Sequence, residues 1–77
     1  PEDERPERIV ERKALAERIV AAVQSLPDAQ REAFLLSEEG DMSLEEIAAL
    51  TGVGRETVKS RLRYALGKLR QELSRWR

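Results

Sequence analysis

SLEEIAALTGVGRETVKSRLRYAL, which is residues 43–66, predicts two helices joined by a turn of three or four residues. Ser43 and Glu46 form the S-x-x-E pattern of a capping box, which marks the start of the first helix. Gly52 lies where the chain must turn sharply, a place that favours a residue tolerant of positive φ. Val58 lies six residues later, where the second helix needs a branched apolar residue against the first. This spacing is typical of a DNA-binding helix-turn-helix, with a plain helical hairpin as the alternative.

Two further helices are predicted before this motif. Residues 1–6, PEDERP, carry two prolines and no apolar periodicity, and we expect them to be the end of an interdomain linker. We expect a first helix over residues 7–25 and a second that is capped by Asp28 and ends near residue 37. Gly40 is expected to supply the left-handed residue after that second helix. The apolar stripe of the first helix comprises Ile9, Ile19, Val20 and Val23, and the inward residues of the second are Ala33, Phe34, Leu35 and Leu36.

The last predicted helix is the longest, from about residue 55 to residue 76. Its apolar residues fall within an arc of roughly 100°, as in an ordinary amphipathic helix. The fold is therefore predicted to be all-α, with residues 7–77 forming one four-helix domain that ends in a helix-turn-helix with a long recognition helix. The inward residues of the motif are Ile47, Ala48 and Leu50, followed by Val58, Leu62, Ala65, Leu66, Leu69, Leu73 and Trp76.

Charge is divided unevenly between the two parts of the chain. The whole sequence has a net charge of −1. Residues 55–77 carry eight Lys or Arg and two acidic residues, whereas residues 1–54 carry six basic and thirteen acidic residues. A basic segment of this kind favours a polyanionic partner such as nucleic acid. A solvated helix face is the alternative when charge alone is considered.

The composition argues against several classes of site. The 77 residues include no Cys and no His, so the thiolate and imidazole ligands of metal sites are missing, and no disulfide can form. We expect that the protein is not an enzyme and binds no cofactor, because the sequence contains no group of residues with the pattern of a catalytic site. No apolar run approaches the ~20 residues that span a bilayer, and we expect a cytoplasmic, nucleoid-associated protein. The chain begins at Pro1, so we expect it to be part of a longer protein.

The first turns of the last helix carry the candidates for base recognition. An Arg or Lys can donate two hydrogen bonds to guanine O6 and N7, and a carboxylate can accept one from the cytosine amino group. Arg55 and Glu56 therefore offer both halves of a G·C code, although a first-turn acid such as Glu56 can equally stabilise the helix dipole. The base-reading candidates are Arg55, Glu56, Lys59, Ser60 and Arg63.

Phosphate contacts are expected beside this surface. Backbone amides at the start of the preceding helix, around residues 43–45, favour an anion. Lys59 and Arg61 lie at the edges of the outward face, where contact with phosphate is favoured over base reading. The phosphate candidates are Ser43, Leu44, Thr57, Arg61 and Tyr64.

Several short segments follow one another in the order found in bacterial sigma factors. They are LP at 26–27, QRE at 30–32, FLL at 34–36, SLEEIA at 43–48 and TVKSRL at 57–62. Together they resemble region 4, the C-terminal domain, of the extracytoplasmic-function group. The resemblance implies an alternative sigma factor that recognises the promoter −35 element in double-stranded DNA during transcription initiation. It also implies docking to the β flap of RNA polymerase and inhibition by an anti-sigma factor.

The resemblance is incomplete after the turn. The group usually has proline or serine after the turn valine and a glycine before the Thr-Val pair, whereas Gly54 and Glu56 take those places here. This stretch is instead similar to primary sigma factors, in which an Arg-Glu pair reads −35 bases. That similarity implies base reading by Arg55 and Glu56. Tyr64 stands where some members of the group carry arginine.

Two other interpretations stay open on the sequence alone. The effector domain of a two-component or quorum-sensing regulator has a similar four-helix arrangement. Those domains usually carry histidine where Arg61 stands, and Leu-Thr where this chain has Leu26 and Pro27. The other interpretation is a module that mainly binds a protein, such as an anti-sigma factor.

Overall fold

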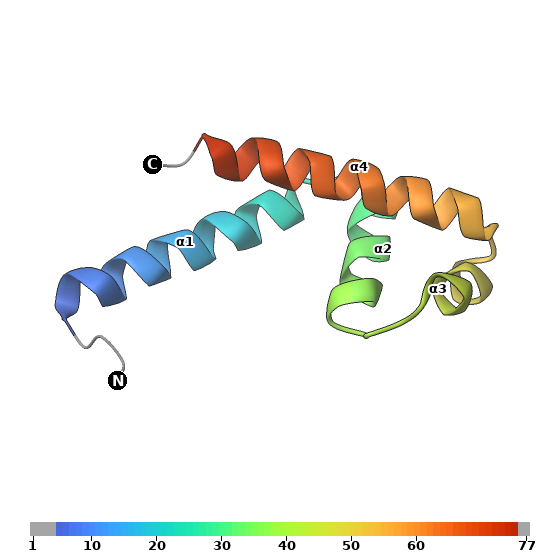
Figure 1. The fold of residues 1–77 in the computed structure, drawn as a ribbon, viewed down its shortest axis with the longest axis horizontal. Coiled ribbons are helices and arrows are strands. Elements are labelled where there is room, and N and C mark those ends of the chain that lie inside the picture. The colour runs from blue at the N-terminus through green and yellow to red at the C-terminus, as the bar shows by residue number, and fades with distance from the viewer. Residues whose placement is uncertain (1–4, 76–77) are drawn as a thin grey trace.

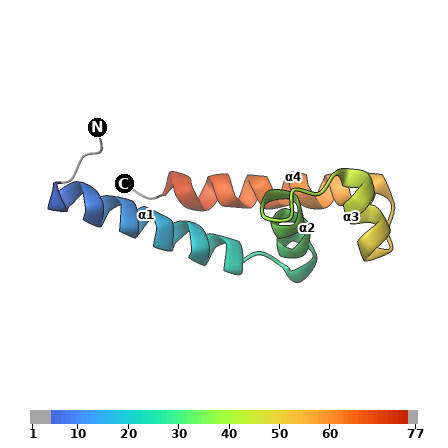
Figure 2. The same cartoon turned by 90° about the horizontal axis from the view of Figure 1, so that it is seen from below.

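The computed structural model describes residues 5–75, which form an elongated bundle of four helices measuring 47 × 26 × 15 Å (Figures 1 and 2). The helices are α1 (Pro6–Gln24), α2 (Asp28–Glu38), α3 (Leu44–Thr51) and α4 (Arg55–Ser74). Residues 5–75 contain no strand, so the all-α prediction is confirmed. α4 packs against each of the other three helices, and α2 also packs against α3. In both views α1 lies beside α4, and α3 lies at the end of the molecule where α4 begins.

The local signals of the helix-turn-helix are confirmed. The Ser43 backbone N–H donates to Glu46 Oε1 at 2.8 Å, and the Glu46 backbone N–H donates to Ser43 Oγ at 3.1 Å. This reciprocal capping box begins α3. Gly52 ends the helix in the left-handed region, with φ 74° and ψ 27°, and its backbone N–H donates to the Ala48 carbonyl at 2.9 Å. A residue with a Cβ would be strained there, which explains the glycine.

The core is small and lies along α4. Ala22 of α1, Leu26, and Ala65 and Leu69 of α4 form one buried cluster, against which Val23 and Phe34 pack. Near the helix-turn-helix, Ile47 of α3 and Val58 of α4 are 1% and 0% exposed and are the largest fully buried side chains of the described residues. α3 and α4 pack directly on each other, and each of them buries one of these two side chains.

The predicted stripe of α1 is mostly exposed. Ile9, Ile19 and Val20 are 46%, 40% and 55% exposed, whereas Val23 is half-buried and Ala22 is buried. Ile9 is exposed because the first turns of α1 extend beyond the end of α4 in both views (Figures 1 and 2). Ile19 and Val20 lie in the last turns of α1, but they line an open surface groove instead of the core. Only the last turns of α1 reach the core.

Two predictions at the ends of α2 are wrong. Pro27, not Asp28, is the N-cap of α2, and the Asp28 carboxylate instead accepts a hydrogen bond from Arg31 Nη2 at 2.8 Å. After α2 the left-handed residue is Asp41, with φ 54°, and not Gly40. Gly40 is needed for space, because a Cβ at this position would lie 2.7 Å from the Leu36 carbonyl oxygen. Asp tolerates the left-handed region better than most residues, so Asp41 can adopt the left-handed conformation that follows α2.

Two residues predicted to face inward are exposed. Leu50 of α3 is 64% exposed and Leu66 of α4 is 41% exposed. At about 100° per residue, the buried and half-buried side of α3 is centred between Ile47 and Thr51, and Leu50 lies roughly 80° from that centre. Leu66 lies about 80° from the fully buried Val58 by the same measure.

Some predictions fall at the chain ends. Trp76, predicted to face inward, lies outside the described residues. The linker predicted for residues 1–6 stays a prediction, because residues 1–4 are not described; α1 begins at Pro6.

Candidate nucleic-acid interface

The first two turns of α4 present polar side chains around one buried anchor. Arg55, Glu56, Thr57 and Lys59 are all exposed, while Val58 between them is fully buried. Because Val58 is held against the rest of the bundle, the neighbouring side chains point away from it into solvent. The helix therefore offers an acid, a hydroxyl and two cations at its N-terminal end. A recognition helix uses this part to reach base edges in the major groove.

Arg55 is held by a carboxylate from the other helix of the motif. Its Nε donates a hydrogen bond to Glu45 Oε2 at 2.7 Å, and its Nη1 lies 3.7 Å from Glu56 Oε2. Glu45 lies in the first turn of α3. A hydrogen bond from its own backbone amide, followed by the one from Arg55, holds the pKa of the Glu45 carboxyl below its ordinary value. The carboxylate is therefore charged at neutral pH. The sequence pattern gave no indication of this contact between residues ten positions apart.

The start of α3 lies at the same end of the molecule as the start of α4, as the Glu45–Arg55 bond requires (Figure 1). Of the phosphate candidates here, Ser43 already uses both its backbone N–H and its hydroxyl oxygen in the capping box. Leu44 is the first residue of α3, so its backbone N–H has no partner inside the helix. The Leu44 amide is thus better placed than Ser43 to receive an anion.

The remaining candidates have different surroundings. Arg63 and Tyr64 are exposed, and Arg63 Cζ lies 5.5 Å from the centroid of the Tyr64 ring, a cation–π contact. Ser60 is half-buried. Arg61 is also half-buried, and it shares a surface hollow with Asp28 and Glu32 of α2. Ser60 and Arg61 are accordingly less open to a ligand than Arg55, Glu56 and Lys59.

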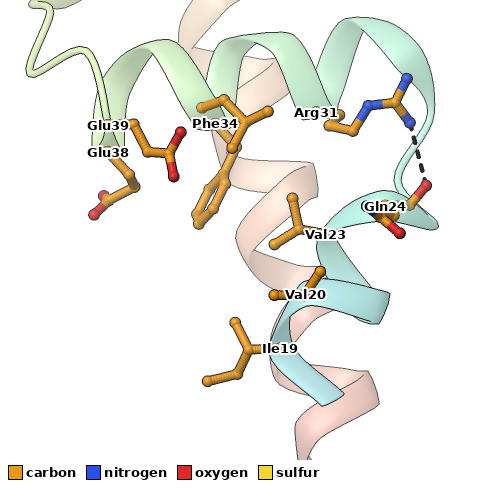
Figure 3. A pocket seen from close by; sticks show the side chains of 9 residues that line it. Ile19, Val20, Val23, Gln24, Arg31, Phe34, Glu38 and Glu39 are labelled. Carbon is orange, nitrogen blue, oxygen red and sulfur yellow. Dashed lines mark hydrogen bonds between the residues drawn. The ribbon is translucent and has the colours of Figure 1, made fainter. Parts of the chain in front are cut away.

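A second feature is an apolar groove between α1 and α2, shown in Figure 3. Ile19, Val20 and Val23 line it from α1, and Phe34 and Leu35 line it from α2. Arg31, Glu38 and Glu39 add a charged rim, and the Arg31 guanidinium also donates to the carbonyl oxygens of Gln24 and Leu26 at 3.2 and 3.0 Å. These bonds tie the Arg31 side chain of α2 to the backbone at the end of α1 and in the connection that follows it. They therefore help to hold the two walls of the groove in place. The exposed stripe of α1 supplies one wall of it.

Neither a metal site nor a membrane span is found in the described part of the chain. Residues 5–75 hold no group of three or more acidic, His or Cys side chains that could bind a metal ion. Within the same residues no helix has the length and apolar character needed to cross a bilayer.

Comparisons with known proteins agree with this geometry. The family described as "Sigma-70, region 4" matches residues 16–69. The ECF RNA polymerase sigma factor RpoE of Cereibacter sphaeroides is 44% identical over 57 residues, which cover 74% of this chain and 32% of that protein. The ECF RNA polymerase sigma factor SigE of Mycolicibacterium smegmatis is 38% identical over 74 residues, which cover 96% of this chain and 29% of that protein. The chain thus spans about a third of the length of these curated relatives.

Proposed function

Because the chain belongs to the sigma-70 region 4 family of extracytoplasmic-function sigma factors, we propose that it recognises the promoter −35 element for an alternative sigma factor. The observation that carries the proposal is the exposure of Arg55, Glu56 and Lys59 around the fully buried Val58 at the start of α4. Arg55 and Glu56 are proposed to read base edges, with Ser60 and Arg63 farther along the helix. Thr57, Arg61 and Tyr64, with the first turn of α3, are proposed to contact phosphates. The role is non-enzymatic, and it is exerted on chromosomal DNA in the cytoplasm.

The test is binding of this chain to fluorescent duplex DNA, measured by anisotropy over a series of salt concentrations. One small domain should bind random duplexes weakly, with Kd on the order of 10⁻⁴–10⁻⁶ M at physiological salt. Duplexes enriched by the chain from a random pool should bind more tightly than the pool. Salt-dependent binding without any sequence preference would contradict base reading. Absence of binding at every salt concentration would favour a module that mainly binds protein.

Lys59→Ala is expected to weaken binding to all duplexes by a similar factor. Lys59 is exposed beside the proposed reading surface, where an ammonium group neutralises phosphate without distinguishing bases. The slope of log K against log salt should fall by about one unit. Lys68→Ala is the matched control, because Lys68 is an exposed lysine of the same helix on roughly the opposite side. An unchanged slope in Lys59→Ala would remove this residue from the interface.

We further propose that the groove between α1 and α2 receives the β flap of RNA polymerase. Its apolar walls and the exposed Val20 support this role, since a partner would cover surface that the chain leaves open to water. An anti-sigma factor that occupied the same groove would block the polymerase.

Val20→Glu is expected to weaken binding of the chain to the polymerase flap by roughly tenfold or more, because docking would bury an unpaired carboxylate. Val20 is 55% exposed, so the substitution should not unfold the chain. The control is Val10→Glu, at a 65% exposed position of α1 outside the groove. The measurement is retention on immobilised flap or core polymerase. Equal retention of the two variants would contradict the proposed docking site, and DNA binding should be unaffected in both.

A further inference from the structure

We propose that Glu45, on α3, positions Arg55 for base reading and thereby sets how strongly this arginine discriminates between base pairs. The inference rests on the proposed function, in which Arg55 contacts DNA. Glu45 itself is not proposed to touch a base. It acts through the bond between its Oε2 and Arg55 Nε, which are 2.7 Å apart.

The chemistry of the guanidinium favours this division of roles. Arginine has five N–H donors in a planar fork, and the bond to Glu45 uses the single donor on Nε. The four donors on the two terminal nitrogens stay available, because the Nη1 contact with Glu56 Oε2 is 3.7 Å long, beyond hydrogen-bond length. Guanine O6 and N7 accept two hydrogen bonds from such a fork. Glu45 therefore holds the inner edge of the guanidinium while its outer edge remains free to bind.

The backbone that carries Glu45 is held in place by the capping box at the start of α3. Glu45 is the second residue of α3, directly between Leu44 and Glu46, and the capping box of Ser43 and Glu46 anchors this turn. Glu46 cannot replace it, because the Glu46 carboxylate is bonded to the Ser43 amide. The pKa of the Glu45 carboxyl is held low by its own backbone amide and by Arg55, so the partner of the guanidinium is charged at neutral pH.

The pair contributes little to folding. The side chains of Arg55 and Glu45 are 49% and 68% exposed, and exposed ion pairs stabilise proteins only weakly. A bond between two helices that adds little stability, yet fixes a long side chain of the proposed reading surface, is better explained by preorganisation. Preorganisation reduces the loss of side-chain freedom when the arginine binds a base.

A competing role for Glu45 predicts a different result. If the carboxylate merely sequestered Arg55, its removal would release the arginine and tighten binding to the preferred duplex. If Glu45 positions Arg55, its removal lowers discrimination at the base pair that Arg55 reads. In the positioning case non-specific binding still becomes slightly tighter, because one negative charge near the phosphates is lost.

The experiment compares this chain with Glu45→Gln, Arg55→Ala and the double variant. The probes are a duplex enriched by the wild-type chain and a set of duplexes that each differ from it at one base pair. Arg55→Ala should identify the base pair that depends on arginine. At that pair Glu45→Gln should reduce discrimination by about three- to tenfold, the range expected for ordering one long side chain. The double variant should discriminate no worse than Arg55→Ala.

The matched control is Glu11→Gln, which removes one exposed carboxylate from α1, at the other end of the molecule (Figure 1). It should leave discrimination unchanged. Thermal unfolding of Glu45→Gln should match that of the wild type, which separates positioning from a structural effect. Full discrimination in Glu45→Gln, or tighter binding to the enriched duplex, would overturn the inference while the proposed function stood. If the wild-type chain prefers no duplex, the proposed function itself fails.

Discussion

Val58→Asp is expected to unfold the chain. Val58 is 0% exposed, and no buried polar or charged side chain is present in the described residues to pair with a new carboxylate. Moving an unpaired charge into such a site costs several kcal/mol. A single core in a domain of this size rarely supplies more than about 3–5 kcal/mol of stability, so little or no native population should remain. Far-UV circular dichroism and thermal melting measure the loss.

Thr57→Asp is the matched control for this variant. Thr57 is exposed and adjacent to Val58 in the first turn of α4. An acid in the first turn of a helix is favourable, so the melting temperature should be kept or slightly raised. A native melting curve for Val58→Asp would show that Val58 does not anchor α4. The outward orientation of Arg55, Glu56 and Lys59 would then lose its support.

The features that sequence predicted well are local ones. The capping box of Ser43 and Glu46 and the left-handed Gly52 depend on residues within one turn of each other, and both are found as predicted. The predictions that Asp28 caps α2 and that Gly40 is the left-handed residue were wrong for a related reason. In each case the adjacent residue, Pro27 or Asp41, took the expected backbone position, since several residues near a helix end can satisfy the same requirement.

The extent of burial was less predictable. A periodic pattern identifies the apolar side of a helix, but tertiary packing decides which part of that side is covered. Leu50 and Leu66 lie at the margins of their apolar sides and are exposed, whereas Ile47 and Val58 lie near the centres and are buried. In α1 the first turns, which carry Ile9, extend beyond α4, and Ile19 and Val20 line an open groove, which the pattern alone could not reveal.

In the candidate site, too, local features were predictable and contacts between helices were not. The exposure of polar side chains at the start of α4 was predictable from the sequence pattern, while base reading by them stays a prediction. The bond from Arg55 to Glu45 was not predictable, since it joins residues ten positions apart through the angle at which α3 and α4 pack. The half-buried position of Arg61 beside Asp28 and Glu32 depends likewise on the packing of α2 against α4.

Glu56→Ala is expected to relax sequence specificity while leaving the fold intact. The Glu56 side chain is 82% exposed, so its removal creates no cavity. Loss of a first-turn acid should cost only about 0.3–1 kcal/mol of stability. If the carboxylate accepts a hydrogen bond from a cytosine amino group, discrimination at one or two base pairs should fall by about 1–3 kcal/mol. The measurement is competition between the enriched duplex and duplexes changed at single base pairs.

The control, Glu72→Ala, removes a carboxylate from the last turns of α4 and should leave discrimination unchanged. Glu56→Ala also removes a negative charge close to the proposed phosphate contacts, so binding to unrelated duplexes should become slightly tighter. Specific and non-specific affinity therefore move in opposite directions if Glu56 reads a base. An equal change on every duplex would mean that Glu56 acts only on the helix dipole and the local charge. Base reading at the start of α4 would then depend on Arg55. The chain would recognise one G·C base pair fewer than proposed.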